Sequence, residues 1–230
     1  MYYYEAKLLS PLFYRTRPDS GAAGATTTDP WIGDLALAYA INASLGLSNI
    51  SFKYNSSKPD YNEIIELPFF VSVALPLPGM RFTRVYDTAT SFISQGYFNK
   101  KAFDKTGNAP MRNWLKRQGI APGSKFQFAM AVSDNWYPPQ EFTVRLGNMK
   151  ESLVLLKRVD STRSKISINL YTLMLFLKHK NINYNIEELA KDIYSSDAEY
   201  QSMMEYVMPQ YVILRNVQPE KWLSYIEGFH

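Results

Sequence analysis

The chain has 230 residues, of which 46% are hydrophobic, and its 25 Lys and Arg residues against 21 Asp and Glu give a net charge of +4. This length and apolar content are sufficient for a buried core and exclude an intrinsically disordered chain. The absence of cysteine excludes a disulfide scaffold, a cysteine nucleophile and a thiolate metal site, and it favours a reducing compartment.

Membrane targeting signals are missing from the sequence. The opening residues have neither the charged front nor the apolar stretch of a signal peptide. The longest apolar runs, residues 67–77 and 170–177, are too short to span a bilayer. We therefore expect a cytoplasmic protein that does not contact a membrane.

The first part of the chain contains signals for a strand and a helix. Residues 2–8 alternate with period two, which predicts a half-buried strand, and the small residues 20–28 predict a loop. Asp29 and Pro30 then supply an N-cap and a proline at the first helical position, so a helix is predicted from there to Gly46. Its predicted buried face consists of Ile32, Leu35, Ala36, Tyr39 and Ala43.

The middle of the chain predicts a sheet interrupted by a long excursion. After a polar loop over residues 48–62, the apolar run 69–75 predicts a buried strand ended by prolines. The mixture of polar and apolar residues over 111–118 favours a helix. The alternating or apolar segments that follow predict three further strands, at residues 126–132, 142–146 and 153–159.

The last third favours helices around one strand. Residues 168–180 are long enough and apolar enough to predict a helix, and residues 186–194 predict a shorter one. Residues 211–217 predict a final strand, and Pro219 begins a terminal helix.

Positive charge is concentrated between Arg81 and Lys125, where nine Lys and Arg residues face two Asp residues. Aromatic residues are interleaved with these cations. A single nucleic-acid strand needs cations for its phosphates and flat rings for its unstacked bases, so this segment predicts a nucleic-acid contact. The ordinary alternative is a solvated loop with a few core aromatics.

The remaining charge divides the chain into a basic and an acidic region. Residues 145–165 carry six cations against two acids, whereas residues 185–230 carry eight acids against three cations. Such polarity suits a protein that holds an anion on one side and contacts protein partners on the other.

The order of these elements resembles the RAMP proteins, and within them the Cas-five-type subunit of type I-D CRISPR effector complexes. Three stretches carry the resemblance: the tyrosine-rich opening strand that leads into Leu12–Arg17, the segment Asp29–Ala40, and the strand Phe142–Leu146 closed by Gly147. The match spans residues 1–159. The glycine-rich loop typical of RAMP proteins is reduced here to Gly147-Asn148-Met149-Lys150.

The resemblance implies an α+β fold: a ferredoxin-like or RRM-like antiparallel sheet with helices on one face, a protruding basic arm and a smaller C-terminal extension. We expect a RAMP domain over residues 1–165, with the arm at 81–125, and an extension over residues 166–230 that packs on the same domain.

The resemblance also implies a non-catalytic subunit of an RNA-guided surveillance complex, without cofactor or metal. Such subunits bind the 5′ handle of the CRISPR RNA and cap one end of the complex. They contact the repeating backbone subunit and the large subunit, near the place where the double-stranded DNA target first engages.

The expected RNA-binding residues fall into two groups of cations and one of aromatic residues. In the arm, cations would contact phosphates: Arg81, Arg84, Lys100, Lys101, Lys105, Arg112, Lys116 and Arg117. At the handle site the corresponding cations are Arg15, Arg17, Arg145 and Lys150. Tyr97 and Trp114 are the expected stacking platforms.

Two alternatives remain open from the sequence. Some RAMP relatives cut CRISPR RNA without metal, which requires a general acid and a general base, and the two histidines here are His179, at a predicted helix end, and His230. Alternatively, the basic segment docks onto an acidic protein and its aromatic residues fill apolar pockets, with no RNA involved.

Overall fold

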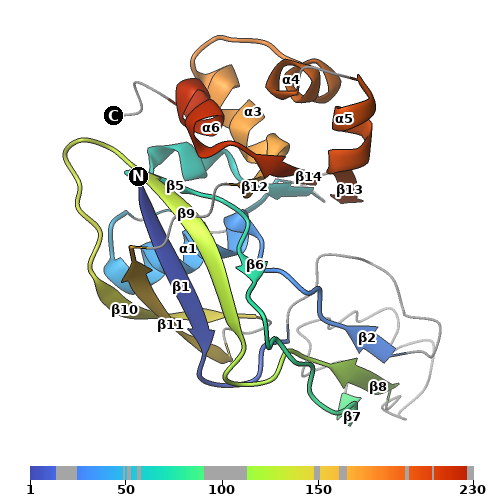
Figure 1. Cartoon of the computed structure of the whole chain (residues 1–230). Helices are drawn as coiled ribbons and strands as arrows, with labels where there is room; N and C mark the ends of the chain where they lie inside the picture. Colours follow the sequence, from blue (N-terminus) through green and yellow to red (C-terminus); the bar gives the residue numbers. More distant parts are fainter. Residues whose placement is uncertain are drawn as a thin grey trace.

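The computed structural model describes residues 1–13, 25–48, 50, 53–55, 58–90, 113–147, 151–160, 165–194, 197–208 and 210–226. Figure 1 shows a central antiparallel sheet with one long helix behind it, a second unit of helices and short strands above it, and a small sheet that projects at the lower right. The predicted α+β class with an antiparallel sheet is confirmed.

The main sheet has six strands. Five follow the order β10 (Glu141–Leu146), β11 (Ser152–Val159), β1 (Tyr2–Leu8), β9 (Lys125–Val132) and β5 (Phe69–Val71), and β6 (Leu75–Pro76) also pairs with β9. Every pairing is antiparallel. The strands β1 and β5 therefore run parallel to each other with β9 between them, as in the split βαβ unit of ferredoxin-like folds. The described part of the connection from β9 to β11 contains β10 and no helix.

The strand predicted at residues 69–75 is interrupted before it reaches the prolines. The apolar run 69–75 forms two strands because the Ser72 side chain replaces a ladder contact, its Oγ accepting a hydrogen bond from the Ala129 N–H at 2.9 Å. The predicted polar loop before it also contains local structure, namely β3 (Lys53–Asn55), β4 (Lys58–Asp60) and the 3-10 helix η1 (Asn62–Glu66).

Helix α1 (Asp34–Leu45) begins later than predicted. Ile32 is extended because it exchanges backbone hydrogen bonds with Ala74, at 3.0 and 2.9 Å, so Asp29 cannot cap the helix and Gly33 occupies the N-cap. The predicted end is confirmed, since Gly46 adopts a φ of 62° and its N–H bonds to the Asn42 carbonyl. The predicted single buried face is wrong in part: α1 contacts β10, β5 and η1 and is buried on most sides, while Ala43 is exposed.

The predicted helix at residues 111–118 is wrong, because this segment contains strand β8 (Asn113–Gln118). It lies between β7 (Tyr86–Thr90), which is antiparallel to it, and β2 (Ala25–Thr27), which is parallel. The strand β2 also corrects the loop predicted at residues 20–28. Pairing partners that are distant in sequence outweighed a weak local helical preference. This three-stranded arm sheet is the part that projects from the body in Figure 1.

The C-terminal unit combines a three-stranded sheet with four helices. Its elements are β12 (Ile166–Asn169), α3 (Leu170–His179), α4 (Ile186–Ile193), α5 (Asp197–Met203), β13 (Met204–Met208), β14 (Tyr211–Val217) and α6 (Pro219–Ile226). The predicted helices at 186–194 and from Pro219 are confirmed, as is the strand 211–217. The helix predicted at 168–180 begins only at Leu170, because Asn169 ends a strand and its side chain caps the helix.

Two cores lie on opposite faces of the main sheet. On the α1 side, Tyr4 stacks on Phe128 with ring centroids 5.7 Å apart, and both are buried. On the other side, Phe70, Ala129 and Ala131 pack with the C-terminal unit. The C-terminal unit therefore covers only one end of this second face. None of the described helices is long and apolar enough to cross a membrane.

A buried carboxylate joins the two parts of the chain. Asp34, at the start of α1, accepts hydrogen bonds from the Asn169 side-chain amide at 3.0 Å and from the Thr172 hydroxyl. Asn169 also donates to the Gln210 carbonyl at 2.9 Å and accepts from the Val212 N–H. Burial raises the pKa of Asp34 to about 6, although these hydrogen bonds act in the opposite direction.

Candidate nucleic-acid interface

The base of the arm is a ribbon held by backbone hydrogen bonds. The Ala121 N–H donates to the Arg81 carbonyl and the Thr83 N–H donates to the Gly119 carbonyl, both at 2.8 Å. Arg81, Phe82 and Arg84 are exposed on this ribbon, and 40% of Phe82 is accessible to solvent. A hydrogen-bonded backbone therefore presents one aromatic ring and two arginines to solvent.

The segment Leu12–Phe13 passes between two glycines at the same place. Leu12 exchanges backbone hydrogen bonds with Ile120, at 3.0 and 2.9 Å. A Cβ atom at Gly119 would lie 2.7 Å from the Leu12 carbonyl oxygen, and a Cβ atom at Gly147 would lie 2.9 Å from the Phe13 carbonyl oxygen. Gly147 also has a φ of 87°, which favours glycine.

This packing joins two stretches that the sequence analysis assigned to one site. Phe13 directly precedes the stretch that holds Arg15 and Arg17, and Gly147 lies between Arg145 and Lys150. The contact between Phe13 and Gly147 brings the two chain segments together, and Gly119 links both to the end of β8.

Some of the predicted contact residues lie within the described part of the chain, and others lie outside it. Arg81, Arg84 and Arg145 are exposed on the arm base and on β10. Trp114, Lys116 and Arg117 lie in β8, of which the backbone is described. The others lie outside the described residues: Arg15, Arg17, Tyr97, Lys100, Lys101, Lys105, Arg112 and Lys150.

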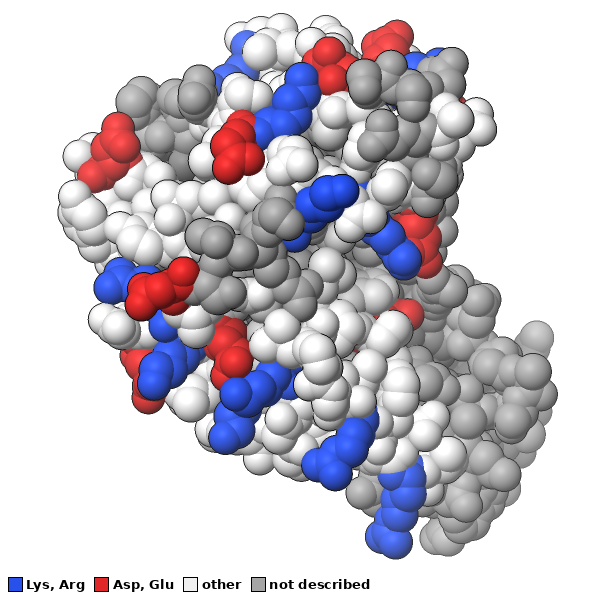
Figure 2. Space-filling model, viewed as in Figure 1, with Lys and Arg blue, Asp and Glu red and all other residues white. Residues whose placement is uncertain are grey.

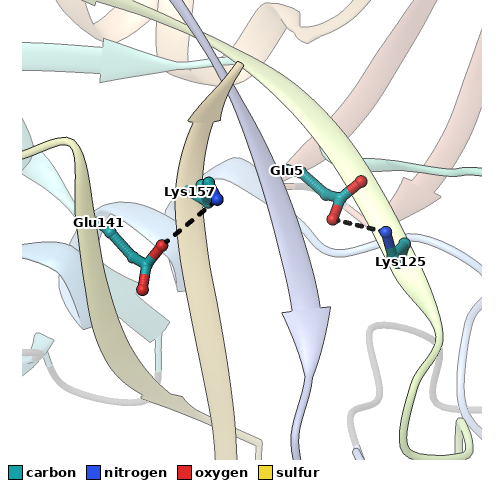
Figure 3. A network of polar contacts seen from close by, with 4 residues as sticks. All are labelled: Glu5, Lys125, Glu141 and Lys157. Atoms are coloured by element: carbon teal, nitrogen blue, oxygen red, sulfur yellow. Dashed lines mark ion pairs between the residues drawn. The ribbon is translucent and has the colours of Figure 1, made fainter.

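Four charged residues form a ladder across the main sheet on the face opposite α1 (Figure 3). Lys125 on β9 contacts Glu5 on β1 at 2.9 Å, and Lys157 on β11 contacts Glu141 on β10 at 3.8 Å. Glu5 is also directly opposite Lys157 in the β1–β11 register. The signs alternate from β10 to β9, so each acid lies next to a lysine on a neighbouring strand.

Two further cations lie on the same face. Lys7 is exposed and directly opposite Lys125 in the β1–β9 register, and Arg145 is exposed opposite Leu153. On the strands β10, β11, β1 and β9 this face thus carries four cations, Lys7, Lys125, Lys157 and Arg145, against the two acids Glu5 and Glu141. Figure 2 looks onto this side and shows blue side chains over the lower half of the molecule.

The sequence analysis did not name Lys7 as a candidate contact, and it counted Lys125 only within the basic segment 81–125. The sequence signal that could have identified Lys7 is its outward position in the alternating strand 2–8. Which lysines share a face across strands depends on the register, and a single sequence does not contain it.

The described parts of these surfaces carry exposed lysines and arginines. His179 is exposed as the last residue of α3, where a cation interacts favourably with the helix dipole, and His230 lies outside the described residues. Within the described residues, no group of three or more His, Asp or Glu side chains is placed to hold a metal ion. Lysines and arginines in extended rows suit phosphate groups instead.

Comparisons with known proteins give a family and several solved structures with some likeness to this chain. No curated protein matches the sequence. A cryo-EM structure of the type III-B Cmr-beta complex, bound to cognate target RNA and AMPPnP, contains a chain that is 8% identical; the match covers 94% of this chain and 84% of that chain, with a TM-score of 0.43. The family model of the type I-D CRISPR-associated protein Cas5/Csc1 matches residues 1–218. Because this match spans nearly the whole sequence, the chain belongs to the type I-D CRISPR-associated Cas5/Csc1 family.

Proposed function

We propose that the chain is a non-catalytic subunit of a type I-D CRISPR effector complex that binds the 5′ handle of the CRISPR RNA and caps one end of the complex. In this proposal it also contacts the backbone and large subunits near the place where the target duplex first engages. Family membership supports this proposal.

One observation carries the proposed RNA site: the packing of Leu12–Phe13 against Gly119 and Gly147. It brings Phe13, which precedes one basic handle stretch, and Gly147, which lies within the other, next to the base of the arm. Phosphates need cations, and the exposed ring of Phe82 at this place suits a base that is not stacked in a duplex.

The test uses a repeat-derived handle RNA and the full chain. Fluorescence anisotropy at several salt concentrations should show an affinity that falls steeply with salt, because RNA binding releases counterions. Replacing Lys100, Lys101, Lys105, Arg112, Lys116 and Arg117 with alanine should weaken binding and flatten the slope by about 0.7 per lost phosphate contact. A control variant that loses Lys178 and Lys221 in the C-terminal unit should bind like the wild type.

Unchanged affinity and slope in the six-residue variant would refute the arm as an RNA contact and would favour the docking of an acidic protein. A second measurement addresses assembly. Co-expression with the neighbouring genes should yield a complex that carries a discrete short RNA, and the six-residue variant should lower the yield of that complex.

A further inference from the structure

We propose that the uncovered part of the main-sheet face is a second RNA contact, at which Lys7 and Lys125 bind the phosphate backbone of a single strand and Glu5 occupies Lys125 when RNA is absent. The inference rests on the proposed function, since it assigns a further surface to the same ligand. It concerns residues outside the arm and the handle stretches.

The register of the β1–β9 pair brings two lysines together. Lys7 and Lys125 are directly opposite on neighbouring antiparallel strands, on the face away from α1. Like charges in this position destabilise a sheet unless an anion lies between or beside them. Within the described part of the chain no ion pair involves Lys7, so its charge is available to a ligand.

Glu5 is positioned to compensate the charge of Lys125. Its carboxylate contacts the Lys125 ammonium at 2.9 Å, and with 24% of its side chain exposed it is less accessible than Lys125, at 46%. Glu5 therefore compensates Lys125 from within the sheet surface, while the ammonium remains open to solvent. A phosphate could bind between the two lysines in place of the carboxylate contact.

The sheet surface at Lys125 is continuous with the arm base. The Ser124 hydroxyl accepts a hydrogen bond from the Arg81 N–H at 3.2 Å, and Lys125 is the next residue after Ser124. Arg81 is exposed on the arm base, next to the start of β9. Cations thus continue from the arm base onto the sheet, and the lower half of Figure 2 shows them over this region.

The side chains around Lys7 and Lys125 decide which part of an RNA strand this surface can bind. Around Lys7 and Lys125 the outward residues of the described strands are charged, polar or aliphatic, namely Glu5, Thr143, Arg145, Leu153, Leu155 and Lys157. The aromatic Tyr3 lies at the other end, against the C-terminal unit. Without a ring to stack on, bases gain little here, so the surface contacts phosphates and should not depend on sequence.

The test uses variants of the full chain in which charged side chains are replaced by uncharged glutamine. Lys7→Gln with Lys125→Gln should weaken binding of the handle RNA and of oligouridine alike, and should flatten the salt dependence by about 1.4, or about 0.7 for each of two contacts. Glu5→Gln should bind more tightly, with a steeper slope by up to about 0.7, because Lys125 is freed. Glu141→Gln is the matched control, as it removes the same charge from the other ion pair of the ladder, and it should behave like the wild type.

The outcomes separate this inference from the proposed function. If the lysine variant keeps its affinity and slope while the six-residue arm variant loses both, the sheet contact is refuted and the arm contact stands. Weaker binding by Glu5→Gln, with an unchanged melting temperature, would also refute it. If the wild type binds neither RNA, the proposed function itself fails. Loss of complex assembly with RNA binding intact in the lysine variant would assign this face to a protein subunit instead.

Discussion

Replacing Asp34 with asparagine should remove a pH dependence of stability between about pH 4 and about pH 6. Burial raises the pKa of Asp34 from 3.8 to about 6 in the folded protein, while the unfolded chain keeps a pKa near the usual value. In this interval the folded state holds a proton that the unfolded state has released. The contribution of Asp34 to the free energy of unfolding should therefore be largest below about pH 4 and should be lost as the pH rises to about 6.

The magnitude follows from the size of the shift. A difference of about two pH units corresponds to about 3 kcal/mol, since one unit is 1.36 kcal/mol. Asparagine keeps one acceptor for Asn169 or Thr172 and does not titrate, so its own effect on stability should not depend on pH.

Urea unfolding of both proteins at pH 4, 5, 6 and 7 measures this effect. The free energy of unfolding of the wild type, minus that of Asp34→Asn, should fall by about 2.4 kcal/mol from pH 4 to pH 7, since at pH 4 the unfolded chain has already released part of its proton. Asp134→Asn, which removes an exposed carboxylate, serves as the control and should give a nearly constant difference. Parallel curves for the wild type and Asp34→Asn would refute the argument.

Three further predictions test the glycine contact, the arm and the absence of catalysis. Gly147→Ala should lower the free energy of unfolding by more than Gly123→Ala. Both glycines have a positive φ, at which an alanine costs about 1–2 kcal/mol, but only a Cβ atom at Gly147 meets the Phe13 carbonyl oxygen. Equal losses in urea unfolding would contradict this contact. Tyr97→Ala should weaken RNA binding by about 1–3 kcal/mol and leave the salt slope unchanged, whereas a flattened slope in anisotropy titrations would argue against stacking. His179→Ala should leave CRISPR RNA maturation unchanged in cells, and accumulation of uncut precursor on an RNA blot would support the ribonuclease alternative.

Period-two patterns made most of the main sheet predictable. Residues 2–8 show it because every second side chain faces the α1 core, and the segments that became β9, β10 and β11 were found by the same signal or by their apolar content. The helix α4 was predictable because its start, at Asn185 and Glu188, is a local capping box.

Features that depend on distant contacts were not predictable. Strand β8 exists because β7 and β2 pair with it, and the late start of α1 depends on the bridge between Ile32 and Ala74. For the candidate site, the sequence indicated Arg81, Arg84 and Arg145 as charged residues. It contained no sign that Glu5 contacts Lys125, since strand register and side-chain conformation decide this contact.

The hydrogen bonds of Asp34 bear on how the chain could be divided in experiments. A chain cut after residue 165 would lose Asn169 and Thr172, and with them both side-chain donors to the Asp34 carboxylate. The same cut would expose Phe70, Ala129 and Ala131, which the C-terminal unit covers. We therefore expect the two parts to unfold as one cooperative unit. Truncation at their boundary should yield an unstable fragment, unsuitable for measuring RNA binding by the N-terminal part alone.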